Sequence, residues 1–416
     1  MMSVEGPFLA AIIARLADPK FNLAAYGVAF SFAVLVEAPV IMIMSASTAL
    51  VEDAASYRKL RNFTYALNGG ITALMLVLIL PPVFRFIAEG LIGLPENVAD
   101  LTHVSLVILL PWPAAIGYRR FFQGLLIRDG RTRLVAYGTV IRLAAMTLTA
   151  LTLFIWRQPA GAYLGAWALS AGVCGEAVAA RLMARGTVGS LLGTVGEDEP
   201  LDYRRITDFY LPLAFTSTLT LAVPPLVTFF MGRARYPVES LAVLPVVNSL
   251  SFIFRSMGLS YQEVAITLLG KRNEHVRELG RFALVLGLAA SSGLALIGFT
   301  PLARVWFEIV SGLTPELSAF AIPPTRILAV IPALSVLLSF QRAILMNGRY
   351  TKPITAATII EVSGILASLL ALTQGLLLIG ATAATIAFIA GRVGANAYLV
   401  PSCLRVVRVS TDVGRH

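Results

Sequence analysis

Long apolar stretches recur along the whole chain, and they constrain its fold more than any other feature. A helix needs roughly 20 apolar residues to cross the hydrocarbon core of a bilayer, which is about 30 Å thick. Hydrophobic residues make up 57% of the 416 and charged residues only 13%, whereas soluble domains carry about 25% charged residues. The chain cannot cover its surface with charge, so lipid must be its main solvent. The sequence predicts an all-α membrane protein with many spans.

Polar segments between the apolar stretches divide the chain into twelve expected transmembrane helices, of which the first is short. Prolines inside them, such as Pro39 and Pro245, are compatible with membrane spans because neighbouring helices can bind the freed carbonyl groups. The expected helices are 1–15, 22–51, 63–88, 99–122, 133–156, 161–184, 205–232, 238–268, 277–304, 316–345, 353–373 and 377–403.

The distribution of basic residues predicts the orientation in the membrane. We assign 22 Lys and Arg to the connections after even-numbered helices and to the C-terminal tail, and 7 to the odd-numbered connections. Because Lys and Arg are retained on the cytoplasmic side, we expect the even connections and the C-terminus to be cytoplasmic. The net charge of +10 then reflects topology, and we expect no binding to nucleic acid.

An internal duplication relates the two halves of the chain at an offset of 218 or 219 residues. Two matches at this offset are Phe122-Gln123 with Phe340-Gln341, and Gly161-Ala162 with Gly380-Ala381. Transporter folds are commonly built from such repeats. Because six helices separate the copies, we expect two parallel six-helix repeats related by an axis along the membrane normal.

The duplication predicts three segments: a first repeat over 1–185, a cytoplasmic linker over 186–203, and a second repeat over 204–416. Helix seven is expected to begin near Arg205, whose counterpart would precede Met1. We therefore expect the first helix, and with it the first repeat, to be incomplete at the N-terminus.

Ionisable residues inside the expected spans are the candidate functional residues. Each costs about 2.5–3.5 kcal/mol on insertion scales, so such residues usually face a cavity or a partner. Under the repeat, Glu37 coincides with Arg255, and Arg142 coincides with Glu361. If those helices face each other, each pair could bridge the two halves and act as a gate. The full set is Glu5, Glu37, Arg142, Glu176, Arg255, Glu263, Arg326, Glu361 and Arg392.

The functional interpretation assigns the buried arginines to substrate and the buried carboxylates to coupling. The planar guanidinium binds phosphate or carboxylate groups bidentately, so an anionic substrate is expected at Arg255, Arg326, Arg142 and Arg392. The carboxylates would serve as gates or as carriers of H⁺ or Na⁺: Glu37, Glu361, Glu5 and Glu176. The alternative is that these charges form salt bridges that only hold the helices together. The Gly and Ala rows of helices six and twelve favour close packing.

Sequence signatures of catalysis are absent. The chain contains no G-x-x-x-x-G-K-[ST] phosphate loop, no nucleophile elbow and no His-based metal motif, and its two cysteines cannot form a disulfide framework. We therefore expect a protein that is not an enzyme, that has no cofactor or metal, and that is driven by an ion gradient or by the gradient of its substrate.

Several short motifs resemble a known family. Tyr26-Gly27-x-Ala29-Phe30-Ser31 in helix two and Arg326-Ile327-x4-Pro332 in helix ten are similar to the progressive ankylosis protein family, as is Gly380-Ala381-Thr382 in helix twelve. That family belongs to the multidrug and toxic compound extrusion (MATE)-like superfamily. The resemblance implies a MATE-like fold and the export of small polyanions such as pyrophosphate, citrate or nucleotides. It also makes Arg326 a candidate anion contact.

The sequence thus predicts a multi-pass secondary transporter of the cell (inner) membrane that exports a small organic or phosphate-containing anion by alternating access. Its expected partners are the lipid bilayer, the anion and a coupling ion, and we expect a monomer. Two alternatives stay open: a cation-coupled multidrug exporter, and a flippase for lipid-linked saccharides. The buried arginines favour anionic cargo over cationic drugs, but they do not distinguish a small polyanion from a lipid with a pyrophosphate head.

Overall fold

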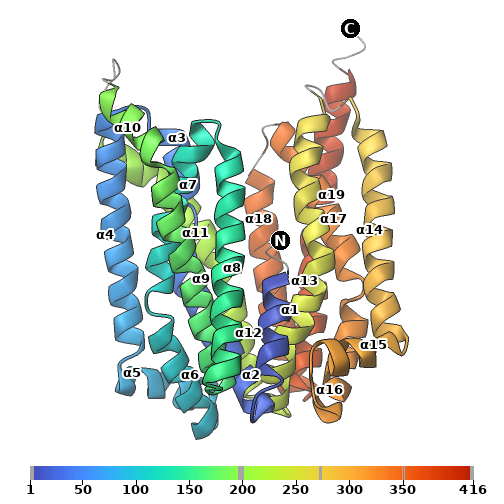
Figure 1. Cartoon of the computed structure of the whole chain (residues 1–416). Helices are drawn as coiled ribbons and strands as arrows, with labels where there is room; N and C mark the ends of the chain where they lie inside the picture. Colours follow the sequence, from blue (N-terminus) through green and yellow to red (C-terminus); the bar gives the residue numbers. More distant parts are fainter. Residues whose placement is uncertain (1–3, 195–200, 271–273, 349, 351, 413–416) are drawn as a thin grey trace. The chain divides into compact units, whose positions relative to one another are not determined.

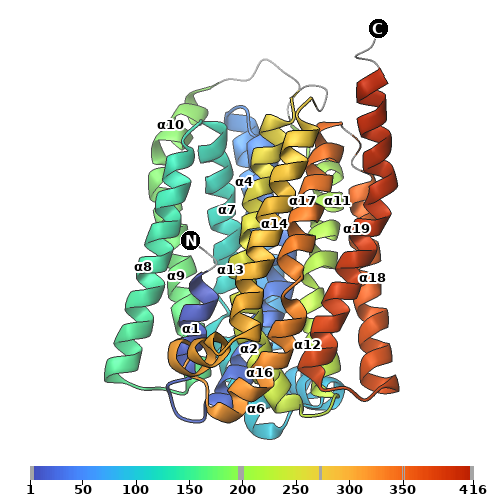
Figure 2. The ribbon, with the colours of Figure 1, turned by 90° about the vertical axis from the view of Figure 1, so that its right-hand side faces the viewer.

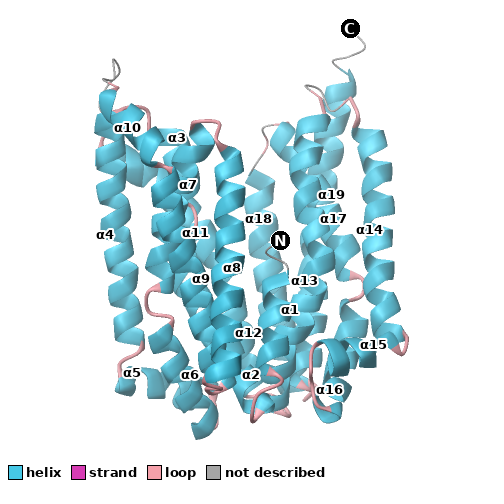
Figure 3. Ribbon diagram, viewed as in Figure 1, coloured by secondary structure: helices cyan, strands magenta, loops and turns pink. Residues whose placement is uncertain are grey.

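The structure is a computed structural model that describes residues 4–194, 201–270, 274–348, 350 and 352–412. It is 87% helical, and the described part of the chain contains no extended strand (Figure 3). Among the described residues, ten helices are long and apolar enough to cross a membrane, and an eleventh span results if the bent pair Ala54–Leu78 and Pro81–Ile92 counts as one. With the short first helix, this agrees with the twelve expected helices and confirms the predicted fold class.

Most predicted spans appear as one helix or as two helices joined at a proline. The span expected at 22–51 breaks after Glu37, and those expected at 99–122 and 316–345 break before Pro113 and Pro332. The helices of the first half are α1 (Glu5–Ile13), α2 (Pro19–Glu37), η2 (Ala38–Val40), α3 (Ile43–Leu50), α4 (Ala54–Leu78), α5 (Pro81–Arg85), η3 (Phe86–Ile92), α6 (Glu96–Ile108), α7 (Trp112–Arg128), α8 (Thr132–Trp156), α9 (Gly161–Met183) and α10 (Arg185–Gly193).

The second half repeats this pattern. Its helices are α11 (Tyr203–Leu221), α12 (Val223–Gly232), α13 (Pro237–Leu268), α14 (Val276–Phe299), α15 (Leu302–Arg304), η4 (Val305–Val310), α16 (Pro315–Leu328), α17 (Ile331–Asn347), α18 (Lys352–Leu370), η5 (Ala371–Gly375) and α19 (Gly380–Asp412).

Two compact units make up the chain, and each contains one helix from the other predicted repeat. The first unit is Leu16–Thr228, and the second joins Ser3–Arg15 to Phe229–His416. In the first unit α11 packs against η2 and α3, and in the second α1 packs against α13. The second unit appears mostly in yellow to red in Figure 1, with α1 in blue. The predicted repeats at 1–185 and 204–416 describe the sequence, and the packed units differ from them: the first helix of each repeat packs in the unit that contains the rest of the other repeat.

In the first unit, a bend in the second span is held by the helix that comes from the second repeat. Proline removes a backbone donor and breaks the helical ladder, so carbonyl groups near Pro39 need other partners. The Tyr210 hydroxyl donates to the carbonyl oxygen of Pro39, and the Ser217 hydroxyl donates to that of Ala38 at 2.8 Å. This bend lies directly beside Glu37.

In the second unit, α18 and α19 run side by side (Figure 2) because small residues let their backbones approach. A Cβ added to Gly391 would lie 2.6 Å from the carbonyl oxygen of Glu361, and Gly364 faces the same glycine. In the first unit, a Cβ added to Gly172 of α9 would lie 3.1 Å from the carbonyl oxygen of Arg142 on α8. The expected close packing of these Gly and Ala rows is therefore present in both units.

Two expected segment boundaries differ from the structure. Helix α4 begins at Ala54 rather than at 63, because the side chain of Asp53 and that of Ser56 form a capping box that starts the helix earlier. The linker expected at 186–203 contains α10. Its acidic segment, 197–200, lies outside the described residues, as do the basic residues 271 and 272 of the connection before α14.

Candidate functional site

A buried charge cluster in the first unit is centred on Glu176 of α9, whose side chain is fully buried. Its carboxylate accepts hydrogen bonds from the Arg119 guanidinium and from Nε2 of Gln123 at 2.9 Å. The Arg142 Nη1 atom of α8 lies 3.9 Å from Glu176 Oε2. Helix α7 supplies Arg119 and Gln123 from one face because they are four residues apart.

Glu37 adds a second carboxylate to this cluster. It is 7% exposed and interacts electrostatically with Arg119, Arg120 and Arg142. Its Oε2 atom is buried without a hydrogen bond to any described residue. The last residue of α2 thus places a carboxylate among three guanidinium groups and leaves one of its oxygens available.

The second unit contains its own cluster, centred on Glu361 of α18. The Glu361 Oε1 atom accepts a hydrogen bond from Nε of Arg392 at 2.8 Å, and Nη2 of Arg392 forms an ion pair with the same oxygen at 2.8 Å. Arg392 Nη1 also donates to the Ser335 hydroxyl at 3.2 Å. The two charged side chains are only 16% and 14% exposed, so this ion pair is largely desolvated.

Two further arginines bring a surplus of positive charge to the second cluster. Arg255 of α13 and Arg342 of α17 both interact electrostatically with Glu361 and with Arg392. Arg342 makes a long hydrogen bond to Thr358 at 3.4 Å. Arg255 has no ion pair within 4.0 Å among the residues that the structure describes. Three guanidinium groups therefore share one carboxylate.

The swapped charges of the repeat find partners inside their own units. Arg142 lies against Glu176 in the first unit, and Glu361 pairs with Arg392 in the second. Glu37 likewise faces arginines of the first unit. The bridges Glu37–Arg255 and Arg142–Glu361 between the two halves stay predictions.

Two predicted site residues lie apart from these clusters. Arg326 of α16 is exposed, donates through Nε to the carbonyl oxygen of Gly298 at 2.9 Å, and stacks over the Phe299 ring at 5.6 Å. It therefore binds the C-terminal end of α14. Glu5 is buried near the start of α1, where that helix packs on α13. Glu263 is exposed on α13. The roles expected for Arg326 and Glu5 stay predictions.

Sequence reasoning missed four members of the clusters. The 22 Lys and Arg that we assign to the cytoplasmic connections include Arg119, Arg120 and Arg342, and Gln123 enters the prediction only as part of a repeat match. The three arginines fall inside the expected helices 99–122 and 316–345. Their position inside these expected helices is the sequence signal that indicates burial. The structure places all three on α7 and α17, inside the helical bundles, and so removes them from the cytoplasmic connections. No group of three or more metal-ligand side chains occurs among the described residues.

No protein-family model matches the chain, and no curated protein resembles its sequence. Solved structures do resemble it. An inward-facing multidrug resistance MATE family transporter of the MOP superfamily is 15% identical with a TM-score of 0.71, over 99% of this chain and 96% of the other. The lipid II flippase MurJ, in an inward closed conformation, is 14% identical with a TM-score of 0.73, over 98% and 88%.

A third solved structure is that of a MOP superfamily transporter from Pyrococcus furiosus Vc1, whose binding pocket is described as having reverse polarity. It is 16% identical with a TM-score of 0.63, over 97% of this chain and 95% of the other. At these identities the likeness concerns the fold, and it agrees with the helix pattern described above. The chain therefore has the MATE-like fold of a multi-pass membrane protein.

Proposed function

We propose that this protein is a secondary transporter that moves a small organic or phosphate-containing anion by alternating access. The observation that carries the proposal is the positive surplus of both buried clusters. The first has three arginines against two carboxylates, and the second has three arginines against one. Salt bridges that only hold helices together would be expected to balance, because an unpaired buried charge is costly.

The second cluster is the stronger candidate for anion binding. Arg255 and Arg342 lie within electrostatic range of the Glu361–Arg392 pair, yet neither makes a salt bridge within 4.0 Å among the described residues. A substrate carrying two negative charges would neutralise the surplus of this cluster. Guanidinium groups bind phosphate and carboxylate bidentately, so pyrophosphate, citrate and nucleotides are the substrate classes to test, in line with the resemblance to the progressive ankylosis family.

The first cluster is the candidate site for coupling. Glu37 lies beside the Pro39 bend and has a buried oxygen without a hydrogen bond to described residues. Binding of H⁺ or Na⁺ there would change the charge of the cluster and the environment of the bend at once. Glu361 is the equivalent candidate in the second unit. We further propose a monomer in the cell membrane with a cytoplasmic C-terminus.

A proteoliposome flux assay tests the proposal. Purified protein is reconstituted, and uptake of radiolabelled citrate, pyrophosphate and ATP is compared between wild type, Arg255→Gln and Arg204→Gln. Arg204 is the matched control because its side chain is 89% exposed. We expect Arg255→Gln to reduce anion flux at least tenfold, with Arg204→Gln unchanged.

The alternatives give different results in the same vesicles. Flux of a cationic dye without flux of any anion would replace the proposal by cation-coupled drug export. Movement of a fluorescent lipid pyrophosphate between leaflets, again without soluble anion flux, would replace it by a lipid-linked saccharide flippase. Thermal unfolding of Arg255→Gln shows whether any loss of flux reflects loss of the fold.

A further inference from the structure

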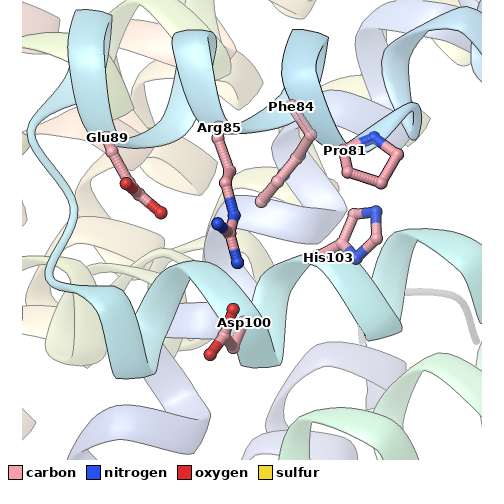
Figure 4. Close-up of a pocket in the computed structure, with 6 residues that line it drawn as sticks. All are labelled: Pro81, Phe84, Arg85, Glu89, Asp100 and His103. Atoms are coloured by element: carbon pink, nitrogen blue, oxygen red, sulfur yellow. The ribbon is translucent and has the colours of Figure 1, made fainter.

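A small charged pocket lies in the first unit and shares no residue with either cluster. Its volume is about 170 Å³, well below the 300–1,000 Å³ of sites for drug-sized ligands. Figure 4 shows Arg85 and Glu89 extending from α5 and η3 towards α6, which carries Asp100 and His103. Among the residues that the structure describes, none of these carboxylates lies within 4.0 Å of the Arg85 guanidinium. The pocket thus presents one cation and two anions whose charges are not paired with each other.

The pocket lies at the ends of two candidate membrane-spanning segments, where lipid headgroups are expected. Four of its residues lie between the end of the α4 span, at Leu78, and the beginning of α6, at Glu96, and the other two, Asp100 and His103, lie in the first turns of α6. The chain turns by 72° between α4 and the segment Pro81–Ile92. That segment buries one apolar face and exposes Phe86 at 67%. A bent amphipathic segment with exposed apolar side chains next to a span is typical of elements that lie in the membrane interface.

The same segment recurs in the second unit, which supplies an internal comparison. At an offset of 219, Arg85 and Glu89 coincide with Arg304 and Glu308, and both copies contain a π-helix. Each copy ends at a glycine with positive φ, 80° at Gly93 and 71° at its counterpart. The segments are therefore built alike.

The two copies differ in the helix that follows. The positions of Asp100 and His103 are occupied by Ala319 and Ile322 in the second repeat. Only the first copy therefore combines the repeated arginine with a carboxylate and an imidazole from the next helix. The pocket is a feature of the first copy, added to a structural element that both copies share.

We infer that this pocket binds the zwitterionic phosphoethanolamine headgroup of a membrane lipid, with the phosphate on Arg85 and the ammonium between Asp100 and His103. A zwitterion matches a pocket that carries charges of both signs. The His103 Nε2 atom lies 2.7 Å from the carbonyl oxygen of Ile79, so a neutral ring has its proton on Nε2 and keeps Nδ1 as an acceptor. An ammonium with three N–H donors suits an imidazole acceptor and a carboxylate.

Other headgroups fit these charges less well. A phosphoglycerol headgroup has no cation, so it would bring a negative phosphate to the pocket without a positive group for the two carboxylates. A phosphocholine headgroup has a cation but no N–H donor for Asp100 or for the imidazole. The expected order of affinity is therefore ethanolamine, then choline, then glycerol.

Native mass spectrometry of the full-length protein tests the assignment. Detergent-solubilised protein is titrated with phosphatidylethanolamine, phosphatidylcholine and phosphatidylglycerol, and bound lipid is counted. We expect Arg85→Ala to weaken the binding of phosphatidylethanolamine about tenfold, equivalent to about 1.4 kcal/mol. Arg304→Ala, at the repeat position without the pocket, should leave binding unchanged. Asp100→Asn should remove the preference for ethanolamine over glycerol headgroups.

Three results would overturn the inference. The first is equal binding of ethanolamine and glycerol lipids to the wild type. The second is equal loss of binding in Arg85→Ala and Arg304→Ala. The third is failure of soluble glycerophosphoethanolamine, in hundredfold excess, to displace the lipid, because the pocket would then not recognise the headgroup. Unfolding temperatures and the Arg85→Lys variant, which keeps the charge and should keep the lipid, separate binding from folding.

Discussion

Replacing Glu176 by Gln would remove the central negative charge of the first cluster while keeping its size. The variant can still accept a hydrogen bond from Gln123, but it leaves Arg119, Arg120 and Arg142 with Glu37 as the remaining carboxylate of the cluster. The net charge of this buried group rises from +1 to +2.

The structure sets the size of the effect. The Arg119 and Glu176 side chains are 3% and 0% exposed, so water screens their interaction very little. Breaking a buried ion pair on one side costs about 3–5 kcal/mol, because the other charge is left uncompensated. A unit of 150–250 residues loses about 2–4 °C in unfolding temperature per kcal/mol. The expected fall is therefore roughly 6–20 °C.

Thermal unfolding in detergent, followed by tryptophan fluorescence, measures this fall. The matched control is Asp208→Asn, which breaks the exposed pair Arg204–Asp208, with side chains 89% and 75% exposed. Exposed ion pairs contribute little to stability, so the control should unfold at the same temperature as the wild type. The double variant Arg119→Met with Glu176→Gln restores a net charge of +1 and should recover most of the loss. Equal unfolding temperatures for Glu176→Gln and Asp208→Asn would refute the reasoning.

Two further predictions concern packing and capping. Gly391→Ala would place a methyl group 2.6 Å from a carbonyl oxygen of α18 and should cost about 1–3 kcal/mol in unfolding free energy. The control is Gly70→Ala in α4, where an added Cβ has no atom within 4 Å, and it should be neutral or stabilising by up to about 1 kcal/mol. A larger loss of unfolding free energy in Gly70→Ala than in Gly391→Ala would contradict the packing assignment. Asp53→Ala should cost about 1 kcal/mol near neutral pH. Hydrogen bonds from Ser56 lower the pKa of Asp53 below its ordinary 3.8 in the folded protein. The stability that the cap contributes is therefore fully present above pH 3.8 and is lost as the pH falls through the lowered pKa. A stability difference between Asp53→Ala and wild type that persists in strong acid would refute the capping assignment.

The spans, the repeat and the list of charged positions were predictable from the sequence. Apolar stretches of sufficient length must become helices in lipid, because backbone groups have no other partners there. That physical constraint acts locally, so every expected span from 22–51 onward has a counterpart in the structure. The start of α4 was missed because the Asp53 capping box begins the helix among polar residues, where hydropathy carries no signal.

The partners of the buried charges were decided by tertiary structure. Sequence pairing by repeat position suggested Glu37 with Arg255 and Arg142 with Glu361. Within the first unit, the packing of α7, α8 and α9 brings Arg119, Gln123 and Arg142 to Glu176, and the bridges between the halves stay predictions.

Position along a helix says which residues are at membrane depth, but it does not say which helix is the neighbour. Arg119 lies near the end of its expected span, 99–122, where the sequence groups it with the cytoplasmic arginines, whereas the structure buries it against Glu176. The sequence determines which residues are charged and predicts their approximate depth from the apolar spans around them. Which of those charges meet depends on how the helices pack, because a salt bridge needs two side chains brought within about 4 Å, and only the folded bundle sets that distance.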